Sequence, residues 1–432
     1  MTDKQTLAIH VPVLARVEGE GALDLIIENE LITDLKLRIF EPPRFFEKFL
    51  EAREPDQVID MVARICGICP VAYQMTAVHA LESLFETDVT PWITQMRRVF
   101  YCGEWIQSHA LHIHMLAMPD FLGFTNVIAM AEQYPEQVRR GLKLQTLGND
   151  LIALFGARSV HPVGVCTGGF HHAPALQQIS DMISRLKQAQ SEARDLLEWI
   201  LSIELSNEDQ DFTSVSLQHS TEYAMNSGRI VSDQGLDIDA NEFSQHFAEQ
   251  HIEHSTALYC FLDNQPYLVG PLARVNINYE QVPDELKALL EKNQIKFPSK
   301  NMFHSIIARA LEIVMCIDEA LHILGNYQLP SQSHVDWKAK SGTAIAATEA
   351  PRGLLWHRYE INDKGQVTEA QIVPPTSQNQ ARIEQNIKLS LESIGLQHSA
   401  DDLQLHAEKV IRNYDPCISC ATHFLKLNVT RQ

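Results

Sequence analysis

The sequence predicts an α+β protein that is mostly α-helical, with a central bundle of long helices and peripheral β-hairpins. Long segments with apolar residues at helical spacing predict the bundle, at residues 91–119, 174–206 and 301–324. Short runs of branched aliphatic residues predict strands in an N-terminal β region (1–40) and in an inserted hairpin (355–373). No internal repeat or clear linker is present, so we expect a single domain over residues 1–432.

Charge and hydropathy exclude several classes of partner. Asp and Glu number 55 against 35 Lys and Arg, a net charge of −20, which argues against nucleic acid and anionic membrane surfaces. The sequence contains no stretch of about 18 apolar residues, so no membrane span is expected. The first residues also lack the basic start and apolar run of a signal peptide. We therefore expect a cytoplasmic protein.

The N-terminal region reads as strands, turns and a short helix. The runs HVPVLARV, ALDLIIEN and LITDLKLRIF within residues 7–40 are rich in β-formers. Between them, Arg16–Gly21 (RVEGEG) sets two glycines beside acids, which suggests a tight turn. A proline pair then interrupts EPPRFFE at 41–47, and a short helix is expected to follow. Local spacing favours an ion pair between Arg44 and Glu47.

The segment Cys66-Gly-Ile-Cys69 is the first of two C-x-x-C pairs. Pro70 stands where a first helical residue would, and helical spacing follows it. Cys69 is therefore expected at a helix N-terminus, where backbone N–H groups favour a thiolate.

The middle of the chain is mainly helical in prediction. His109, His112 and His114 fall in the helix after Pro91, and core histidines are the favoured interpretation. Further helices are expected after Pro135 and over the longer segments given above. Residues 212–300 are mixed, and the elements expected there are strands at 228–232 and 266–269, a short helix at 241–253 and a turn at 270–274.

The C-terminal part contains the second C-x-x-C pair. LLWHRYEI and QVTEAQIV flank the turn NDKG and predict the inserted hairpin. Helices are expected at about 380–394 and 401–413. Asp415 and Pro416 then suggest an N-cap and a first helical residue, which would put Cys417 and Cys420 near a helix start and on one side of it.

Two pairs of thiols, one toward each end of the chain, predict a four-thiolate metal site. Such a soft site suits zinc, an iron–sulfur cluster or nickel. Structural zinc is a real alternative, although ordinary zinc ribbons hold their pairs within a small module. The other cysteines (Cys102, Cys166, Cys260 and Cys316) are expected to be reduced core thiols, which agrees with a reducing compartment.

These motifs resemble the large, catalytic subunit of nickel–iron hydrogenases. The resemblance rests on RVEGEG, EPPRFFE, ICGICPVAYQ, EAPRG, PPTSQN and DPCISCATH, in this order over almost the whole chain. It implies the hydrogenase large-subunit fold. Three of these motifs, EPPRFFE, ICGICPVAYQ and DPCISCATH, together resemble the cytosolic branch of the family. That branch includes NAD(P)-reducing hydrogenases and sulfhydrogenase alpha subunits.

The resemblance also implies the roles of the cysteines. All four would bind nickel, with Cys69 and Cys420 bridging to iron and Cys66 and Cys417 as terminal ligands. The iron would carry carbon monoxide and two cyanide ligands. Glu18 matches the glutamate that receives the proton from a terminal cysteine, here Cys417.

Other matched residues surround that metal pair. Arg352 would hold its guanidinium over the metals, and Asp415 would lie near this arginine. Thr376 would hydrogen-bond a cyanide, and Pro351 would also belong to the cofactor-binding set. Many relatives carry histidine where this chain has Tyr73, and some carry aspartate where it has Ser108.

A second, hard-metal site is implied as well. Glu47, the backbone carbonyl of Ile372 and His423 would hold magnesium or iron, with water completing the shell. Relatives are often cut after the corresponding histidine, so residues 424–432 are a candidate maturation tail.

The expected function is reversible heterolytic cleavage of H2 to protons and electrons. Because the paired cysteines are all used at the active site, electrons would pass to a small iron–sulfur subunit and then to flavin subunits of an NAD(P) diaphorase. A maturation protease and nickel chaperones are further expected partners. Two rivals are a non-catalytic relative, like the quinone-site subunit of respiratory complex I that has lost these cysteines, and a structural four-cysteine zinc protein.

Overall fold

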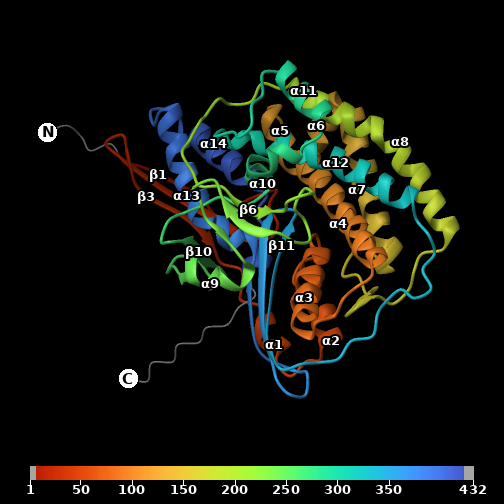
Figure 1. Cartoon of the computed structure of the whole chain (residues 1–432). Coiled ribbons are helices and arrows are strands. Elements are labelled where there is room, and N and C mark those ends of the chain that lie inside the picture. The colour runs from red at the N-terminus through yellow and green to blue at the C-terminus, as the bar shows by residue number, and fades with distance from the viewer. Residues whose placement is uncertain (1–5, 423–432) are drawn as a thin grey trace, which may run out of the picture.

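The computed structural model describes residues 6–422, in which long helices gather on one side and small antiparallel sheets on the other (Figure 1). The mostly helical α+β class with peripheral hairpins is confirmed. Among residues 6–422, no helix combines the length and the apolar character that crossing a bilayer requires.

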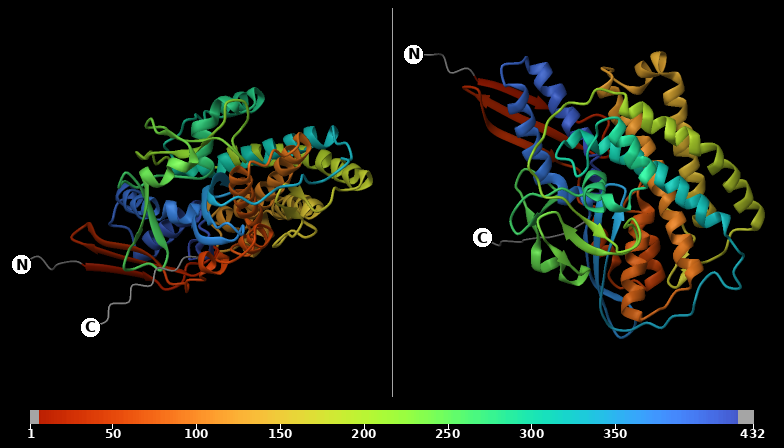
Figure 2. Two further views of the ribbon diagram at one scale, coloured as in Figure 1. Left: turned by 60° about the horizontal axis from the view of Figure 1, so that its bottom comes forward. Right: turned by 45° about the horizontal axis from the view of Figure 1, so that its top comes forward.

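Four long helices form the bundle: α4 (Pro91–Leu111), α7 (Pro135–Gly156), α8 (Leu176–Leu201) and α12 (Ser305–Gly325). α4 packs against α7 and α12, and α12 packs against α8, an arrangement that both views in Figure 2 show. From Met96 to Ala110 every residue of α4 is buried, as expected for a helix at the centre of a bundle. It continues as a π-helical turn, η1 (His112–Ala117), and then as α5 (Met118–Phe121), so the expected helix at 91–119 is present but contains a π segment.

The remaining helices are shorter and connect or cover these layers. They are α1 (Phe46–Leu50), α2 (Pro55–Val62), α3 (Pro70–Phe85), α6 (Val127–Gln133), α9 (Phe243–His246), α10 (Pro271–Asn278), α11 (Asp284–Lys292), α13 (Pro375–Ile394), α14 (Ala400–Asn413) and α15 (Ile418–Ala421). Short 3₁₀ turns, η2 to η4, occupy Ala240–Glu242, Tyr279–Gln281 and Met302–His304.

All strand pairs in the named sheets are antiparallel. The strands are β1 (Thr6–Val11), β2 (Gly21–Glu28) and β3 (Leu31–Ile39); β4 (Val165–Cys166) and β5 (Gly169–Phe170); β6 (Val215–Gln218), β7 (Arg229–Ser232) and β8 (Asp237–Ile238); β9 (Phe247–His251) and β10 (Leu258–Leu262); and β11 (Gly342–Ala350), β12 (Gly353–Ile361) and β13 (Val367–Val373). β11 was not expected, because its sequence GTAIAATEA is dominated by small residues, yet it pairs with β12 along its whole length.

The mixed region at 212–300 contains three wrong predictions. Residues 266–269 form no strand, because only Leu268 makes a bridge, to Ser214. The helix expected at 241–253 ends at His246, and the chain continues as β9, paired with β10. The turn expected at 270–274 is the start of α10, since Gly270 adopts φ +120° and Pro271 occupies the first helical position.

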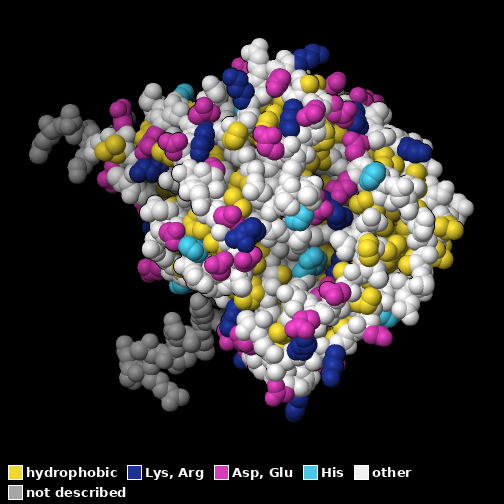
Figure 3. All heavy atoms as spheres, in the orientation of Figure 1, with side chains coloured by type: hydrophobic (Ala, Val, Ile, Leu, Met, Phe, Trp, Pro, Cys, Tyr) yellow, Lys and Arg dark blue, Asp and Glu magenta, His cyan; other side chains and the backbone are white. Residues whose placement is uncertain are grey.

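The two ends of the described chain lie side by side. The sheet of β1, β2 and β3 packs against α13 and α14, as Figures 1 and 2 show by the red strands beside the blue helices. The N–H of Leu37 on β3 donates to the Glu384 carboxylate of α13 at 2.8 Å. This closure brings the first C-x-x-C pair, at the start of α3, next to the second pair at α15. On the face shown in Figure 3, basic and acidic side chains are interspersed.

Candidate metal centre

The four paired cysteines converge on one buried point. Their Sγ atoms all lie within 4.8 Å of one another. Cys66 is 3.5 Å from Cys417, Cys69 is 3.8 Å from Cys420, and Cys417 is 2.7 Å from Cys420. All four side chains belong to the main hydrophobic core, so water has little access to them.

Two helix starts place these thiols. Cys69 precedes α3, with Pro70 at its first position, as predicted. Cys417 directly precedes Ile418, the first residue of α15, and Pro416 lies before the helix. The prediction of Asp415 as the N-cap is therefore wrong by two residues: Asp415 has φ +55°, consistent with the exclusion of right-handed helix before Pro416.

The pKa values of the thiols are shifted in different directions. Hydrogen bonds from Cys417 and the other thiols lower the pKa of Cys66 well below its usual range. Burial raises the pKa of Cys417 and of Cys420. A bound cation would displace these protons, since thiolates are the metal-ligating form. Four convergent sulfur atoms fit nickel, iron or zinc, and they do not distinguish among these metals.

Arg352 extends from the turn between β11 and β12 to the cysteine cluster. Its Nε donates to the backbone carbonyl of Asp415 at 2.8 Å, and its Nη2 donates to the Asp415 carboxylate at 3.1 Å. Burial opposes its charge, but Asp415 and the thiols raise the pKa of Arg352 above its usual value. Its Nη1 and the second Asp415 oxygen are buried without a hydrogen-bond partner among residues 6–422. The unpartnered Nη1 of Arg352 is suited to donate a hydrogen bond to a further ligand on a metal held by the thiols.

Glu18 lies beside Cys417. Its Oε2 is 3.1 Å from Cys417 Sγ and accepts a hydrogen bond from the Ser419 N–H at 3.0 Å. Its carbonyl accepts from the N–H of Ile418 at 2.9 Å. Gly19, at φ +89°, makes this approach feasible, because a Cβ there would lie 2.6 Å from the Ile418 side chain.

Thr376 and Pro351 complete the immediate surroundings. Thr376, in the first turn of α13, accepts a hydrogen bond from the N–H of Cys417 at 2.9 Å, so its own hydroxyl proton is available for a ligand. The carbonyl of Pro351 accepts from Arg274 Nη2 at 2.9 Å.

The residues predicted for a second metal site are partly brought together. Glu47 on α1 accepts a hydrogen bond from the backbone N–H of Ile372 on β13 at 2.8 Å. His423 lies outside the described residues. Arg44, which local spacing paired with Glu47, forms its ion pair with Glu41 at 3.8 Å.

Several buried polar residues near the centre were missed from the sequence. The Glu104 carboxylate of α4 accepts from the N–H groups of Val71 and Ala72 at 2.6 and 3.0 Å, and so caps α3 next to Cys69. Burial raises its pKa well above the usual range. The signal was a lone carboxylate within the apolar run VFYCGEW. Arg274, described below, was likewise missed.

The predicted core residues are where the sequence put them. His109, His112 and His114 are buried, and so are Cys102, Cys166, Cys260 and Cys316. Tyr73 and Ser108 are buried, and their hydroxyl groups have no hydrogen-bond partner among residues 6–422.

Comparison with known proteins agrees with this geometry. The chain is 31% identical over 428 residues to sulfhydrogenase 1 subunit alpha of Pyrococcus furiosus, covering 98% of this chain and 99% of that one. It is 26% identical to the NAD-reducing hydrogenase HoxS subunit beta of Cupriavidus necator, covering 95% and 94%. A crystal structure of an NAD+-reducing [NiFe]-hydrogenase in the H2-reduced state superposes with a TM-score of 0.88 at 25% identity, covering 97% and 99%.

The family profile "Nickel-dependent hydrogenase" matches residues 44–140 and 241–423, which include both cysteine pairs. With its four convergent thiols, this chain belongs to the nickel-dependent hydrogenase family.

Proposed function

We propose that this chain is a hydrogenase catalytic subunit whose four thiolates hold a nickel–iron pair and whose own side chains move the proton released from H2. The observation that carries the proposal is the convergence of four buried Sγ atoms with Arg352 and Glu18 beside them. Cys66 and Cys417 would be terminal nickel ligands, and Cys69 and Cys420 would bridge to iron. When bound, the metal pair would polarise H2 and take up its electrons.

The proton would leave through Cys417 and Glu18. The terminal thiolate of Cys417 would act as the base, and the Glu18 carboxylate at 3.1 Å is within direct hydrogen-bond reach of it. Glu18 is only half-buried, so it can pass the proton onward toward solvent.

Arg352 would supply fixed positive charge. Its guanidinium is anchored on Asp415 and buried, and a buried charge acts far more strongly on a reacting centre than an exposed one. We propose that carbon monoxide and two cyanide ligands on iron lie beside Arg352. The free Nη1 of Arg352, the hydroxyl of Thr376 and the Pro351 segment would then receive the cyanide nitrogens.

We also propose a hard-cation site, for magnesium or iron, at Glu47, the carbonyl of Ile372 and His423. Glu47 and Ile372 are in contact, and oxygen ligands suit such a cation. Glu47→Gln should lower the magnesium content of the purified protein while nickel remains bound. Unchanged magnesium would remove Glu47 from this role.

Electrons must reach a partner subunit. Among residues 6–422, no group of three or more metal-ligating side chains is found besides the four cysteines. We propose a small iron–sulfur subunit, and flavin subunits that serve NAD(P), because the relatives are named as subunits of sulfhydrogenase and NAD-reducing hydrogenase. The described cysteines form no disulfide, which supports a cytoplasmic location. A maturation protease and nickel chaperones would act before assembly.

Metal analysis and infrared spectra of the purified complex test the function. Stoichiometric nickel, cyanide and carbonyl bands, and H2-dependent reduction of NAD+ or NADP+ are expected. Stoichiometric zinc without these bands would establish the structural-zinc alternative, which the four-thiol geometry alone also fits. Loss of NAD(P) reduction with activity retained toward a viologen dye would refute only the proposed acceptor.

A further inference from the structure

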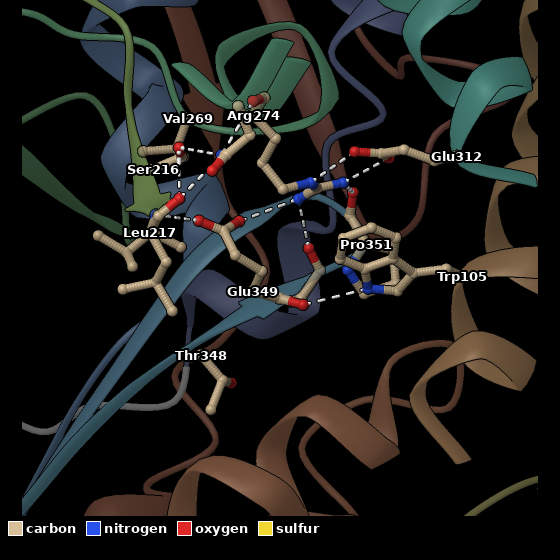
Figure 4. Close-up of polar contacts among 12 residues, drawn as sticks. Trp105, Ser216, Leu217, Val269, Arg274, Glu312, Thr348, Glu349 and Pro351 are labelled. Atoms are coloured by element: carbon tan, nitrogen blue, oxygen red, sulfur yellow. Dashed lines mark hydrogen bonds and ion pairs between the residues drawn. The ribbon is translucent and has the colours of Figure 1, made fainter. Parts of the chain in front are cut away.

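The peptide that carries Arg352 is held by its backbone carbonyl groups (Figure 4). Arg274 of α10 donates from Nη1 to the carbonyl of Ala350 at 2.8 Å and from Nη2 to the carbonyl of Pro351 at 2.9 Å. The indole Nε1 of Trp105 donates to the backbone carbonyl of Glu349 at 3.1 Å. Three successive carbonyls directly before Arg352 are therefore fixed by side chains from two helices.

Arg274 is itself fully engaged. Its Nε and Nη2 each donate to the Glu312 carboxylate at 2.8 Å, and its Nη1 donates to the Glu349 carboxylate at 3.0 Å. Together with the two carbonyls, these contacts use all five N–H donors of a guanidinium. The guanidinium also lies 4.2 Å from the centre of the Trp105 ring. None of the three charged side chains is exposed to solvent.

The two carboxylates are in turn held by other elements. His109 Nε2 and the Tyr223 hydroxyl both lie 2.8 Å from Glu312 oxygens. The N–H of Leu217 on β6 donates to Glu349 at 2.7 Å. Burial alone would raise the pKa of Glu312, but the charge of Arg274 and these hydrogen bonds lower it to about 2. The low pKa keeps Glu312 charged, and the network is tied to α4, α12 and β6 at once.

Close backbone contact adds a second constraint. A Cβ on Gly270, just before α10, would lie 2.9 Å from the carbonyl oxygen of Arg352. A Cβ on Gly353 would lie 2.7 Å from the N of Gly270. The start of α10 thus touches the backbone where Arg352 joins Gly353, and Arg274 lies one helical turn further on.

We propose that Arg274 is a positioning residue for Arg352: it fixes the peptide 349–351 so that the Arg352 guanidinium meets Asp415 and the thiols in one orientation. The inference rests on the proposed role of Arg352 in H2 cleavage. Lysine at position 274 would keep the positive charge but offers three donors from one atom, so it cannot hold two carbonyls and two carboxylates together.

The experiment compares Arg274→Lys with a matched control in the purified complex. Arg97→Lys is the control, because Arg97 also forms a buried bidentate pair with a glutamate, Glu82, at 2.6 and 2.7 Å, and within residues 6–422 it makes no hydrogen bond to residues 349–353. Hydrogen–deuterium exchange of H2 is measured per nickel, in the wild-type background and in an Arg352→Lys background. Because small misplacement of a catalytic group can cost up to about 100-fold, we expect Arg274→Lys to lose at least about 10-fold in the first background. In the second background the loss should be below about 2-fold, as for residues that act through one another.

Amide hydrogen exchange gives a readout that does not depend on activity. Arg274→Lys should increase exchange in a peptide spanning residues 342–361, and Arg97→Lys should not. Equal losses of activity in both backgrounds, or unchanged amide exchange, would overturn the proposal. If Arg274→Lys does not accumulate, Glu349→Gln weakens one of the same contacts and should shift both readouts less, in the same direction; no shift would also overturn it. Absence of nickel-dependent activity in the wild type would instead refute the proposed function, while the amide exchange would still test the positioning.

Discussion

Cys417 Sγ lies 3.1 Å from the Oε2 of Glu18, although 399 positions separate the two residues in the chain. The Ser419 N–H donates to the same oxygen at 3.0 Å, so the carboxylate is held in place and does not rotate freely. In the proposed function, this arrangement would give the Cys417 thiolate a direct proton acceptor, with no intervening water needed.

Glu18→Gln should leave the metal site assembled and slow hydrogen–deuterium exchange of H2 by roughly 100-fold or more, because an amide keeps the contacts but accepts no proton. The measurement is isotope exchange per nickel by mass spectrometry. Glu20→Gln, at the exposed position two residues on, is the control and should behave as wild type. Normal exchange in the Glu18 variant would exclude it from the proton path.

Arg352→Lys should lower turnover by roughly 100-fold, since removal of one fixed charge or donor at a buried reacting centre typically costs that much. Lysine keeps the charge but loses the paired contact to Asp415. Turnover per nickel, with dye as acceptor, gives the result. Arg358→Lys, on β12 and partly exposed, is the matched control. Equal turnover in both variants would show that Arg352 has no catalytic role.

Thr376→Val should both weaken the cysteine loop and alter the iron ligands. The variant leaves the buried N–H of Cys417 without its acceptor, which costs about 1–3 kcal/mol. It also removes the hydroxyl proton that we assign to a cyanide, so one cyanide infrared band should shift. Thr376→Ser retains the hydroxyl and should restore both the melting temperature and the band position. A band unmoved in the valine variant would contradict the assignment.

The sequence motifs located the metal centre because its ligands are cysteines, a rare residue type, at a fixed spacing. Cys66, Cys69, Cys417 and Cys420 could be placed together, since no other set of thiols forms two C-x-x-C pairs. The helix start after Cys69 also followed from local signals. By contrast, Asp415 could not be placed from its neighbours. Asp415 has a left-handed backbone and contacts Arg352, which lies far away in the chain. No local pattern around Asp415 reveals that contact.

The supporting network was beyond the reach of the sequence for the same reason. The local segments around Arg274 and Glu349 do not indicate their partners, and only packing shows the two side chains fully buried and paired. β11 was missed because its partner, β12, supplies the pairing that its small side chains do not signal. Long-range contacts decided these features.

The C-terminal tail yields a prediction on mass. If the family's processing applies here, the active protein should lack residues 424–432, and its intact mass should correspond to a chain that ends at His423. Protein produced without nickel should keep the full mass, because processing would follow metal insertion. Intact mass spectrometry of both preparations checks this. A full-length mass in the active, nickel-containing protein would rule out the cleavage.

The final prediction concerns Glu349, whose pKa burial raises to about 7. Because the folded protein holds this proton more tightly than the unfolded chain, stability is highest below about pH 4.5 and falls as pH rises to 7, by about 3 kcal/mol from this group. Glu312 contributes to stability in the opposite direction, since its pKa is lowered to about 2. Its contribution is lost only as the pH falls below about 4.5. Glu349→Gln should therefore flatten the decline in melting temperature between pH 5 and 7.

The comparison has to be made between variants. Burial lowers the pKa of His79 and His109 to about 4, so these residues add stability as pH rises through the same window. Their contribution is common to wild type and Glu349→Gln and cancels in the difference between the two melting curves. That difference should grow in favour of the glutamine variant from pH 5 to 7 and stay constant above pH 8. Parallel curves throughout would show that Glu349 is ionised across the range, with Arg274 as sufficient compensation for its charge.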